Sequence, residues 1–479
     1  MHSVIERKLK LDVGPRFRLP ELPGQPLPAR RFVSVYYDTP DHRLARHGVT
    51  VRRRTEKRRP RWQVELPHDA ARLELEVERS APAVPEEVRR LLVAYTRGES
   101  LVPVATLRTR RSGVRVSSLQ GPVAEIVLDV ASVLEGPRVA QRFREVEVEL
   151  TERGVEEDLD RIGALLRAAG ARDGDGYPKV FRALGLDVLA TDRPPEPSDP
   201  PLDHVLAMLR DQLAAIRAHD PGTRLGTDPE ELHQMRVAVR RSRAILRAVR
   251  PMFEPDAVRS LREELAWLGG ALGQVRDLDV MRRYLEAELA TLPAPERSAG
   301  VRLLKLLDKA EAGARRDMVK ELDEGRYFAL LDRLAGFVEQ PLVSDAAVSL
   351  EDLAGGEFKR LRRAVQTLPE EPSDAELHAL RIKTKRARYA AELAAPAGGR
   401  PAVRFVKQAK KLQDVLGEHQ DAVVAEKRLS ELFEAAPGRR AAFVVGRLAE
   451  RQRARRLAAR QSIASSWRKL ERRGEKAWE

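Results

Sequence analysis

Apolar residues follow two different periods in the two parts of this chain. In the first 190 residues, short runs in which apolar and polar side chains alternate are separated by turn residues. Such runs predict strands of an antiparallel sheet or barrel. They cover residues 49–54, 62–66, 73–78, 125–129 and 145–150. After residue 201 the alternation disappears, and the apolar spacing is that of long helices up to the end of the chain.

A proline-rich segment separates the two parts. Residues 191–201 read TDRPPEPSDPP and have no periodicity, which is typical of a linker. The sequence therefore predicts an α+β multidomain protein, with a β domain at 1–190, the linker at 191–201 and an all-α domain at 202–479. A second break near residue 345 divides the helical part into predicted repeats at about 202–345 and 346–479.

A histidine followed by a row of cations occurs twice in the helical part, at positions 233 and 378, an offset of 145 residues. A glycine and an aspartate follow each copy at nearly the same offset. Two separate matches indicate an internal duplication. The residues are His233, Arg236, Arg240, Arg243, Gly273 and Asp277 in the first copy and His378, Arg381, Lys385, Arg388, Gly417 and Asp421 in the second.

On a helical wheel the cations of each copy form a stripe about 80° wide that borders the apolar face. Like charges one turn apart repel, so such a stripe destabilises the helix unless an anion neutralises it. The planar guanidinium group suits phosphate oxygens, and a linear row of donors suits a chain of phosphates. The alternatives are a basic surface helix of no special use and histidines that cap or pack. Few aromatic residues lie near the rows, which disfavours a site for single-stranded nucleic acid.

The charge balance agrees with an anionic partner. The 479 residues contain 87 Lys and Arg against 73 Asp and Glu, a net charge of +14. Nucleic acid, an anionic membrane and polymeric phosphate are the partners that this balance favours. Cysteine is absent, which excludes disulfides, thiolate nucleophiles and Cys-ligated zinc. We expect a soluble cytoplasmic protein, because no apolar run has the length of a membrane span or a signal peptide.

The predicted strands carry charges on one face. Arg52 and Arg54 share a face of one strand, and Glu145 and Glu147 share a face of another. If these faces point outward, the sheet is an ordinary half-solvated one. If they point into a barrel, the lumen must be filled by paired charges, water, a metal ion or an anion. Carboxylates suit a hard divalent cation there, and arginines suit the phosphates that it bridges.

The helical part resembles the CHAD family, the conserved-histidine α-helical domain, over residues 202–479. The segments that carry the resemblance are HQMRVAVRRSRAILRAVRPMF, LGGALGQVRDLDV, LHALRIKTKRARYA and LQDVLGEHQD. The resemblance implies two four-helix bundles that bind inorganic polyphosphate. The implied ligand residues are His233, Arg236, Arg240, Arg243, His378, Arg381, Lys385 and Arg388, with Lys407 and Lys411 added from a later helix.

The first 190 residues resemble the CYTH family of triphosphate tunnel enzymes, through IERKLKL, YYDTPDHRLARHGVTVRRRT, EVEVEL and YPKVFRALG. The resemblance implies an eight-stranded antiparallel tunnel that hydrolyses or cyclises triphosphate compounds with Mg²⁺ or Mn²⁺. It places the metal at Glu6, Glu145 and Glu147. It places the catalytic groups at Glu6, Lys8, Arg52, Arg54, Arg110 and Lys179.

Two residues depart from the family's pattern. Val4 stands where the Glu-x-Glu-x-Lys signature has its first glutamate, and Glu65 stands where a phosphate-binding lysine is usual. Three functions therefore stay open. The first is a polyphosphate-binding protein, near polyphosphate granules, whose tunnel hydrolyses triphosphates. The second is a non-enzymatic polyphosphate-targeting module with a degenerate tunnel, and the third, less favoured, is a nucleic-acid-binding protein. None of them requires a membrane.

Overall fold

The computed structural model describes residues 2–68, 71–119, 121–174, 178–186, 200–344, 348–434 and 438–479. The chain forms two compact units, Met1–Thr191 and Asp192–Glu479. Most of the predicted linker, residues 191–199, lies outside the described residues. None of the described helices has the length and apolar character needed to span a membrane.

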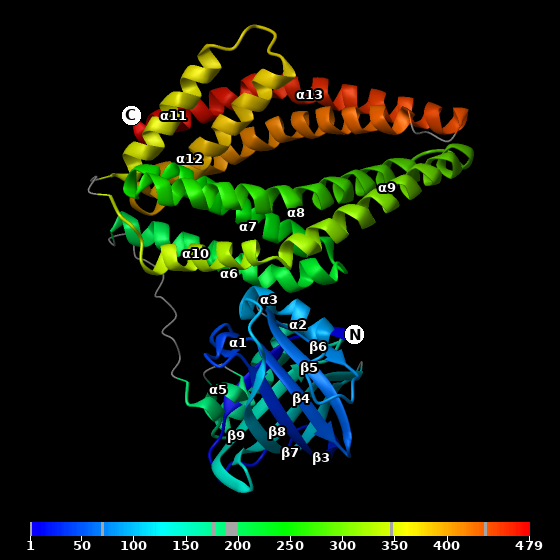
Figure 1. Ribbon diagram of the computed structural model, residues 1–479, viewed down its shortest axis with the longest axis vertical. Helices are drawn as coiled ribbons and strands as arrows, with labels where there is room; N and C mark the ends of the chain where they lie inside the picture. The colour runs from blue at the N-terminus through cyan, green and yellow to red at the C-terminus, as the bar shows by residue number, and fades with distance from the viewer. Residues whose placement is uncertain are drawn as a thin grey trace. The chain divides into compact units, whose positions relative to one another are not determined.

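The first unit is an antiparallel sheet with short helices against it (Figure 1). Its strand order is β1-β6-β5-β4-β3-β7-β8-β9-β2-β10. The strands are β1 His2–Glu6, β2 Lys8–Asp12, β3 Gly24–Asp38, β4 Thr50–Glu56, β5 Arg59–His68, β6 Ala71–Val77, β7 Val102–Ser118, β8 Gly121–Glu135, β9 Arg138–Leu150 and β10 Arg172–Asp173. The helices are α1 Arg43–Arg46, α2 Glu86–Leu91, α3 Val93–Thr96, α4 Glu156–Ala168 and α5 Lys179–Leu184.

One nearly continuous strand contacts both ends of the sheet order. Only Arg7 separates β1 from β2 along the chain, yet β1 pairs with β6 and β2 pairs with β9. The described part of the chain therefore has ten strands instead of the eight expected, because Arg7 divides the first strand and the two-residue β10 is added beside β2.

Helix α4 determines which face of β9 points outward. Ile162 and Leu166 of α4 are buried in one apolar cluster with Val146 and Val148 of β9. Because successive side chains of a strand point to opposite faces, Glu145 and Glu147 must lie on the face away from α4. The sequence left open whether these charges point inward or outward, and the structure buries them.

The second unit is entirely helical in the residues that the structure describes, apart from one isolated bridge between Phe253 and Val343. Figure 1 shows its long helices packed along one another. They are α6 Pro201–Leu225, α7 Pro229–Ala248, the 3-10 helix Arg250–Met252, α8 Pro255–Ala290, α9 Ala294–Leu322, α10 Gly325–Glu339, α11 Leu350–Gln366, α12 Asp374–Glu434 and α13 Arg439–Trp478.

The long helix α12 contains a break that matches a break in the first half of the unit. At Gly399 the backbone has φ 57° and ψ −150°, which no helix accommodates, so α12 is two helices joined at a kink. Position 254, 145 residues earlier, separates α7 from α8. The two breaks are therefore separated by the same 145 residues as the two histidine motifs.

Candidate functional site

The two cationic rows meet where α7 packs against the first half of α12. Lys385 is half-buried among Arg381 and Arg388 of its own helix and Arg236 and Arg240 of α7. Burial and these four positive charges lower the pKa of Lys385 to about 8. The rows therefore converge, as a site for one shared anion requires.

The arginines of the rows lie beside the duplicated glycines. A Cβ added to Gly273 would lie 3.8 Å from the guanidinium of Arg236, and one added to Gly417 would lie 3.7 Å from that of Arg381. In both copies the group packed against the glycine is the arginine side chain of the row.

Several N–H groups of the rows have no acceptor. The Nε atoms of Arg240, Arg381 and Arg388 are buried and make no hydrogen bond within the described part of the protein. A buried donor without an acceptor is costly, so these groups favour an acceptor brought by a ligand. Two carboxylates lie beside the rows: Asp277 is 3.5 Å from Arg236, and the charges of Arg381 and Lys385 act on Asp421.

The two histidines of the rows are not equivalent. His233 is half-buried, and burial together with the charge of Arg276 lowers its pKa. His378 is exposed, and its Nδ1 lies 2.8 Å from the amide oxygen of Gln420. Arg276 and Gln420 occupy matching positions in the two copies, so the residue that faces the histidine has changed while the histidine has not.

Three predicted ligand residues lie further out. Arg243 is exposed, and its guanidinium lies near Gly269 of α8. Lys407 and Lys411 are exposed on the second half of α12. Among the described residues, no hydrogen bond or ion pair joins either lysine to the rows.

In the first unit, the charged faces of the strands enclose a cavity of about 130 Å³. It is lined almost entirely by polar and charged side chains, so this part of the sheet encloses a polar lumen. The lining residues are Lys8, Phe32, Ser34, Tyr36, Arg52, Arg54, Glu65, Glu74, Thr109, Arg111, Glu147, Glu149 and Lys179.

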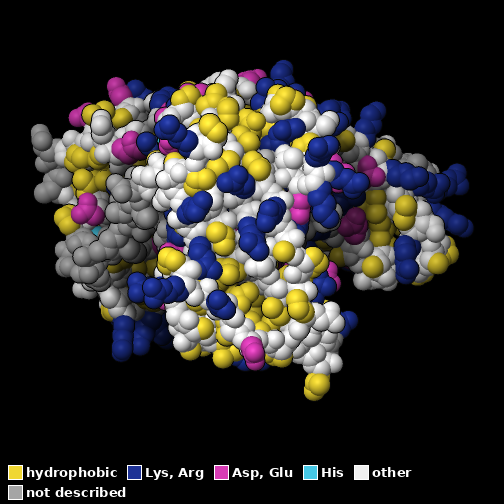
Figure 2. Space-filling model, turned by 90° about the horizontal axis from the view of Figure 1, so that it is seen from below, with side chains coloured by type: hydrophobic (Ala, Val, Ile, Leu, Met, Phe, Trp, Pro, Cys, Tyr) yellow, Lys and Arg dark blue, Asp and Glu magenta, His cyan; other side chains and the backbone are white. Residues whose placement is uncertain are grey.

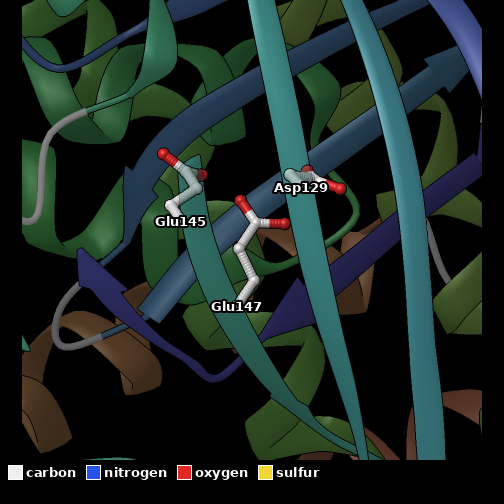
Figure 3. A group of neighbouring side chains, drawn as sticks. All are labelled: Asp129, Glu145 and Glu147. Atoms are coloured by element: carbon white, nitrogen blue, oxygen red, sulfur yellow. The ribbon is translucent and has the colours of Figure 1, made fainter. Parts of the chain in front are cut away.

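Glu147 lines this lumen and belongs to a cluster of three buried carboxylates from two neighbouring strands. Asp129 of β8 and Glu145 and Glu147 of β9 present oxygens within 4.8 Å of one another. Figure 3 shows the three side chains on their two strands. The ammonium group of Lys179 lies 2.5 Å from Asp129, 3.0 Å from Glu145 and 3.2 Å from Glu147. Asp129 was missed in the sequence. Its register opposite Glu145 would have revealed it, but only once the strand pairing was known.

The charges in this cluster shift its pKa values in different directions. Burial opposes ionisation of Asp129 and Glu147, but Lys179 and Arg111 hold the pKa of both below the ordinary range. Burial and the neighbouring Glu147 raise the pKa of Glu145. Although burial works against it, the three carboxylates raise the pKa of Lys179 well above normal.

The donor set of the cluster fits a hard divalent cation. Carboxylate oxygens are the ligands that Mg²⁺ and Mn²⁺ prefer. One buried oxygen, Oε1 of Glu145, makes no hydrogen bond of good geometry within the described residues, although Lys179 is 3.0 Å away. Lys179 itself lies between the three carboxylates, so a bound ion requires that its side chain move aside.

The prediction of Arg110 as a phosphate ligand is wrong. Arg110 is exposed, whereas its neighbour Arg111 lines the cavity and pairs with Asp129 and Glu147, each at 2.7 Å. The inward residues of β7 are the odd-numbered ones, beginning with the fully buried Leu107. Side chains alternate along a strand, so Arg110 must point outward.

The other predicted cations do line the cavity. Arg52 is 2.7 Å from Glu65, so the unexpected glutamate is neutralised within the lumen. Lys8 lies 3.7 Å from Glu74. Glu6 is in β1 opposite Arg72 in the ladder, but its side chain and that of Val4 lie outside the described residues.

Arg54 differs from these paired cations. Its Nε and Nη2 atoms are buried without a hydrogen-bond partner in the described structure. Its guanidinium stacks 3.5 Å over the ring of Phe32, and a Glu56 oxygen is 3.7 Å away. Burial and the nearby charges of Arg52 and Arg111 lower its pKa to about 10. Arg54 is thus the lumen cation best placed to receive an anion.

Surface charge by itself does not locate a site. On the face shown in Figure 2, Lys and Arg side chains are spread between apolar and neutral ones and form no single patch. The informative cations are the half-buried ones of the rows and the lumen.

Comparison with known proteins assigns each unit to a domain family. Residues 2–173 match the CYTH domain, and residues 207–430 match the CHAD domain. Over 468 residues the chain is 30% identical to the uncharacterized protein Rv2226 of Mycobacterium tuberculosis, covering 89% of this chain and 88% of that protein. The chain therefore belongs to the family of proteins in which a CYTH domain is followed by a CHAD domain.

Solved structures with similarity to the helical unit include PptA from Streptomyces chartreusis and the CHAD domain of the plant Ricinus communis. PptA is 24% identical, with a TM-score of 0.48, and the match covers 56% of this chain and all of PptA. The Ricinus domain is 26% identical, with a TM-score of 0.44, and the match covers 60% of this chain and 94% of that domain.

The carboxylate cluster generates a prediction about stability. Replacing Lys179 by Met leaves three buried carboxylates without their ammonium partner, which destabilises the first unit by about 3–5 kcal/mol in a chelating buffer. Adding Mg²⁺ or Mn²⁺ raises the melting temperature of this variant more than that of the wild type. Differential scanning calorimetry with and without the ions measures both effects. Equal responses of the two proteins to the ions would contradict a metal site here.

Proposed function

We propose that this protein binds inorganic polyphosphate through its helical unit. The observation that supports this most strongly is the crossing of α7 and α12, where Lys385 lies among four arginines of two helices. Such a cluster is destabilising in the free protein, and a polyanion converts the repulsion into attraction. Arginine forks with unused N–H groups suit phosphate oxygens in particular.

A chain of phosphates suits the site better than a single ion. Residues one turn apart rise about 5 Å along a helix, so each row offers donors in a line. The matching glycines, the matching rows and the break at Gly399 support two duplicated helical bundles that each supply one row. A polymer that lies along both rows contacts cations of both bundles.

For the first unit we propose metal-dependent hydrolysis of triphosphates in a closed tunnel. Its support is that Glu147 of the carboxylate cluster lines the same cavity as Arg54, a buried guanidinium with unused donors. Mg²⁺ or Mn²⁺ held by Asp129, Glu145 and Glu147 would neutralise charge on phosphate oxygens and activate a water molecule. Arg54, Arg52 and Lys8 bind and orient the phosphates. Lys179 leaves the carboxylates and binds phosphate oxygen instead.

A binding-only tunnel is the second candidate, and one observation favours it. Lys179 and Arg111 already satisfy the carboxylates, so the lumen is nearly neutral without any ion. In that case the tunnel adds affinity for phosphate chains and does not cleave them. Nucleic acid is the third candidate, and competition between duplex DNA or RNA and long-chain polyphosphate at equal phosphate concentration distinguishes it.

Reversing the charge at the crossing tests the binding site. Arg240→Glu with Lys385→Glu places carboxylates among the remaining arginines, so we expect affinity for long-chain polyphosphate to fall more than 100-fold, about 3 kcal/mol or more. Arg439→Glu with Arg440→Glu changes the net charge equally at two exposed residues of α13 and serves as the control. Isothermal titration calorimetry measures binding, and circular dichroism verifies the helix content. Equal losses in the two double variants would refute a specific site.

The pKa of Lys385 predicts a pH dependence. A bound polyanion raises this pKa, which is about 8 in the free protein, so binding takes up a proton once the pH approaches 8. Affinity is therefore constant well below this pH and falls by up to about tenfold per unit as the pH rises beyond it. Lys385→Arg stays charged throughout, and its affinity changes little over the same range. Titrations at constant ionic strength from pH 7 to about 10 provide the measurement.

Phosphate release from tripolyphosphate tests the tunnel. We expect release that requires Mg²⁺ or Mn²⁺, with kcat/KM reduced at least about 100-fold by Arg54→Met because a buried phosphate contact is lost. Arg110→Met, which alters an exposed arginine on the outer face, retains wild-type rates. Absence of release from the wild-type protein, with tripolyphosphate binding intact, would establish the binding-only tunnel instead.

A further inference from the structure

The two cationic rows end differently, although their sequences are copies. With the offset of 145 residues, Arg241 corresponds to Arg386, and Glu392 corresponds to Arg247. The row of α12 therefore ends in a carboxylate, whereas the row of α7 continues with another cation. This single difference in sign changes the electrostatics at one end of the crossing.

At the α12 end, one carboxylate pairs with two of the cations. Glu392 accepts an ion pair from Arg388 at 3.2 Å on its own helix and another from Arg241 of α7 at 3.3 Å. The half-buried carboxylate of Glu392 thus links the two helices at this end of the rows.

At the α7 end, cations from three helices gather without such a carboxylate. Burial lowers the pKa of Arg386 of α12, and the nearby charges of Arg247 of α7 and Arg262 of α8 lower it further. The Nε atoms of Arg262 and Arg386 are both buried and have no hydrogen-bond partner in the described residues. Arg243 lies near Gly269 of α8, and its positive charge contributes to the lowered pKa of Arg262 after burial and the charge of Arg247.

The carboxylates that face this group do not neutralise it. Glu357 of α11 is 2.7 Å from Arg360, which brings a further positive charge to Arg386. Glu263 follows Arg262 on α8 and is exposed. No ion pair joins either glutamate to Arg247, Arg262 or Arg386 in the described part of the chain.

We propose that Arg247, Arg262 and Arg386 form an additional anion subsite that extends the polyphosphate site at one end only. The inference rests on the proposed polyphosphate function and adds a determinant of chain length to it. The guanidinium groups of Arg262 and Arg386, which have unused donors, and that of Arg247 suit one further phosphate group of a polymer that already lies along the rows. A triphosphate held at the crossing would be too short to need this subsite, whereas a long chain would occupy both.

The matched pair Arg386→Gln and Arg241→Gln tests the subsite, because each removes one guanidinium at corresponding positions. We expect Arg386→Gln to weaken long-chain polyphosphate binding about tenfold and to leave tripolyphosphate binding within about twofold of the wild type. Arg241→Gln, which removes a cation already paired with Glu392, leaves both affinities within about twofold. Glu392→Gln frees Arg241 and Arg388 and strengthens long-chain binding. Thermal unfolding verifies that all variants are folded.

The outcomes separate this inference from the function on which it rests. Equal long-chain affinities of Arg386→Gln and Arg241→Gln, with normal wild-type binding, would overturn the subsite alone. A loss in Arg386→Gln that is as large for tripolyphosphate as for the long chain would overturn it as well, because the residue would then belong to the crossing. A wild-type protein that binds no polyphosphate would overturn both proposals.

Discussion

The helical unit is organised around repulsion between like charges. Lys385 and four arginines from two helices are held close together in a half-buried position, where water screens their charges poorly. Apolar packing of α7, α8 and α12 must supply the stability that overcomes this repulsion, as the fully buried Leu246, Leu272 and Leu412 indicate. The fold thus maintains a region of high positive potential that only an anionic ligand can relieve.

The β unit also buries many charges, but it pairs them with charges of the opposite sign. Its lumen contains both signs of charge, and most cations are paired there, as Lys179 is with Asp129, Glu145 and Glu147. Arg54 is held more weakly, because a Glu56 oxygen is 3.7 Å away and two of its buried donors make no hydrogen bond in the described residues. A ligand entering this lumen must exchange existing ion pairs for new ones, so its binding gains less than binding at the helical crossing. This contrast explains why the helical site is the stronger basis for a functional proposal.

Much of this arrangement could be predicted from the sequence. Period and composition located both units, and the duplicated rows located the crossing, because a helix places residues at i, i+3 and i+7 on one face whatever surrounds it. The register of the strands was harder to predict. Arg110 was chosen over Arg111 because strand parity depends on where the inward face begins, which Leu107 reveals only in the folded sheet. Asp129 was missed because its partners are 16 and 18 residues away in sequence. The sequence shows that Glu392 stands where the first copy has Arg247. Only the ion pairs of Glu392 in the structure show that this difference changes the charge at one end of the rows.

The most direct test of the account is the thermal stability of Lys385→Met at low ionic strength. If the crossing is strained by repulsion, removal of its central charge raises the melting temperature of the ligand-free protein, by about 2–4 °C for each kcal/mol relieved. The same variant should lose most of the stabilisation that long-chain polyphosphate gives the wild type. A variant that melts at a lower temperature than the wild type, or that polyphosphate still stabilises fully, would contradict the central claim.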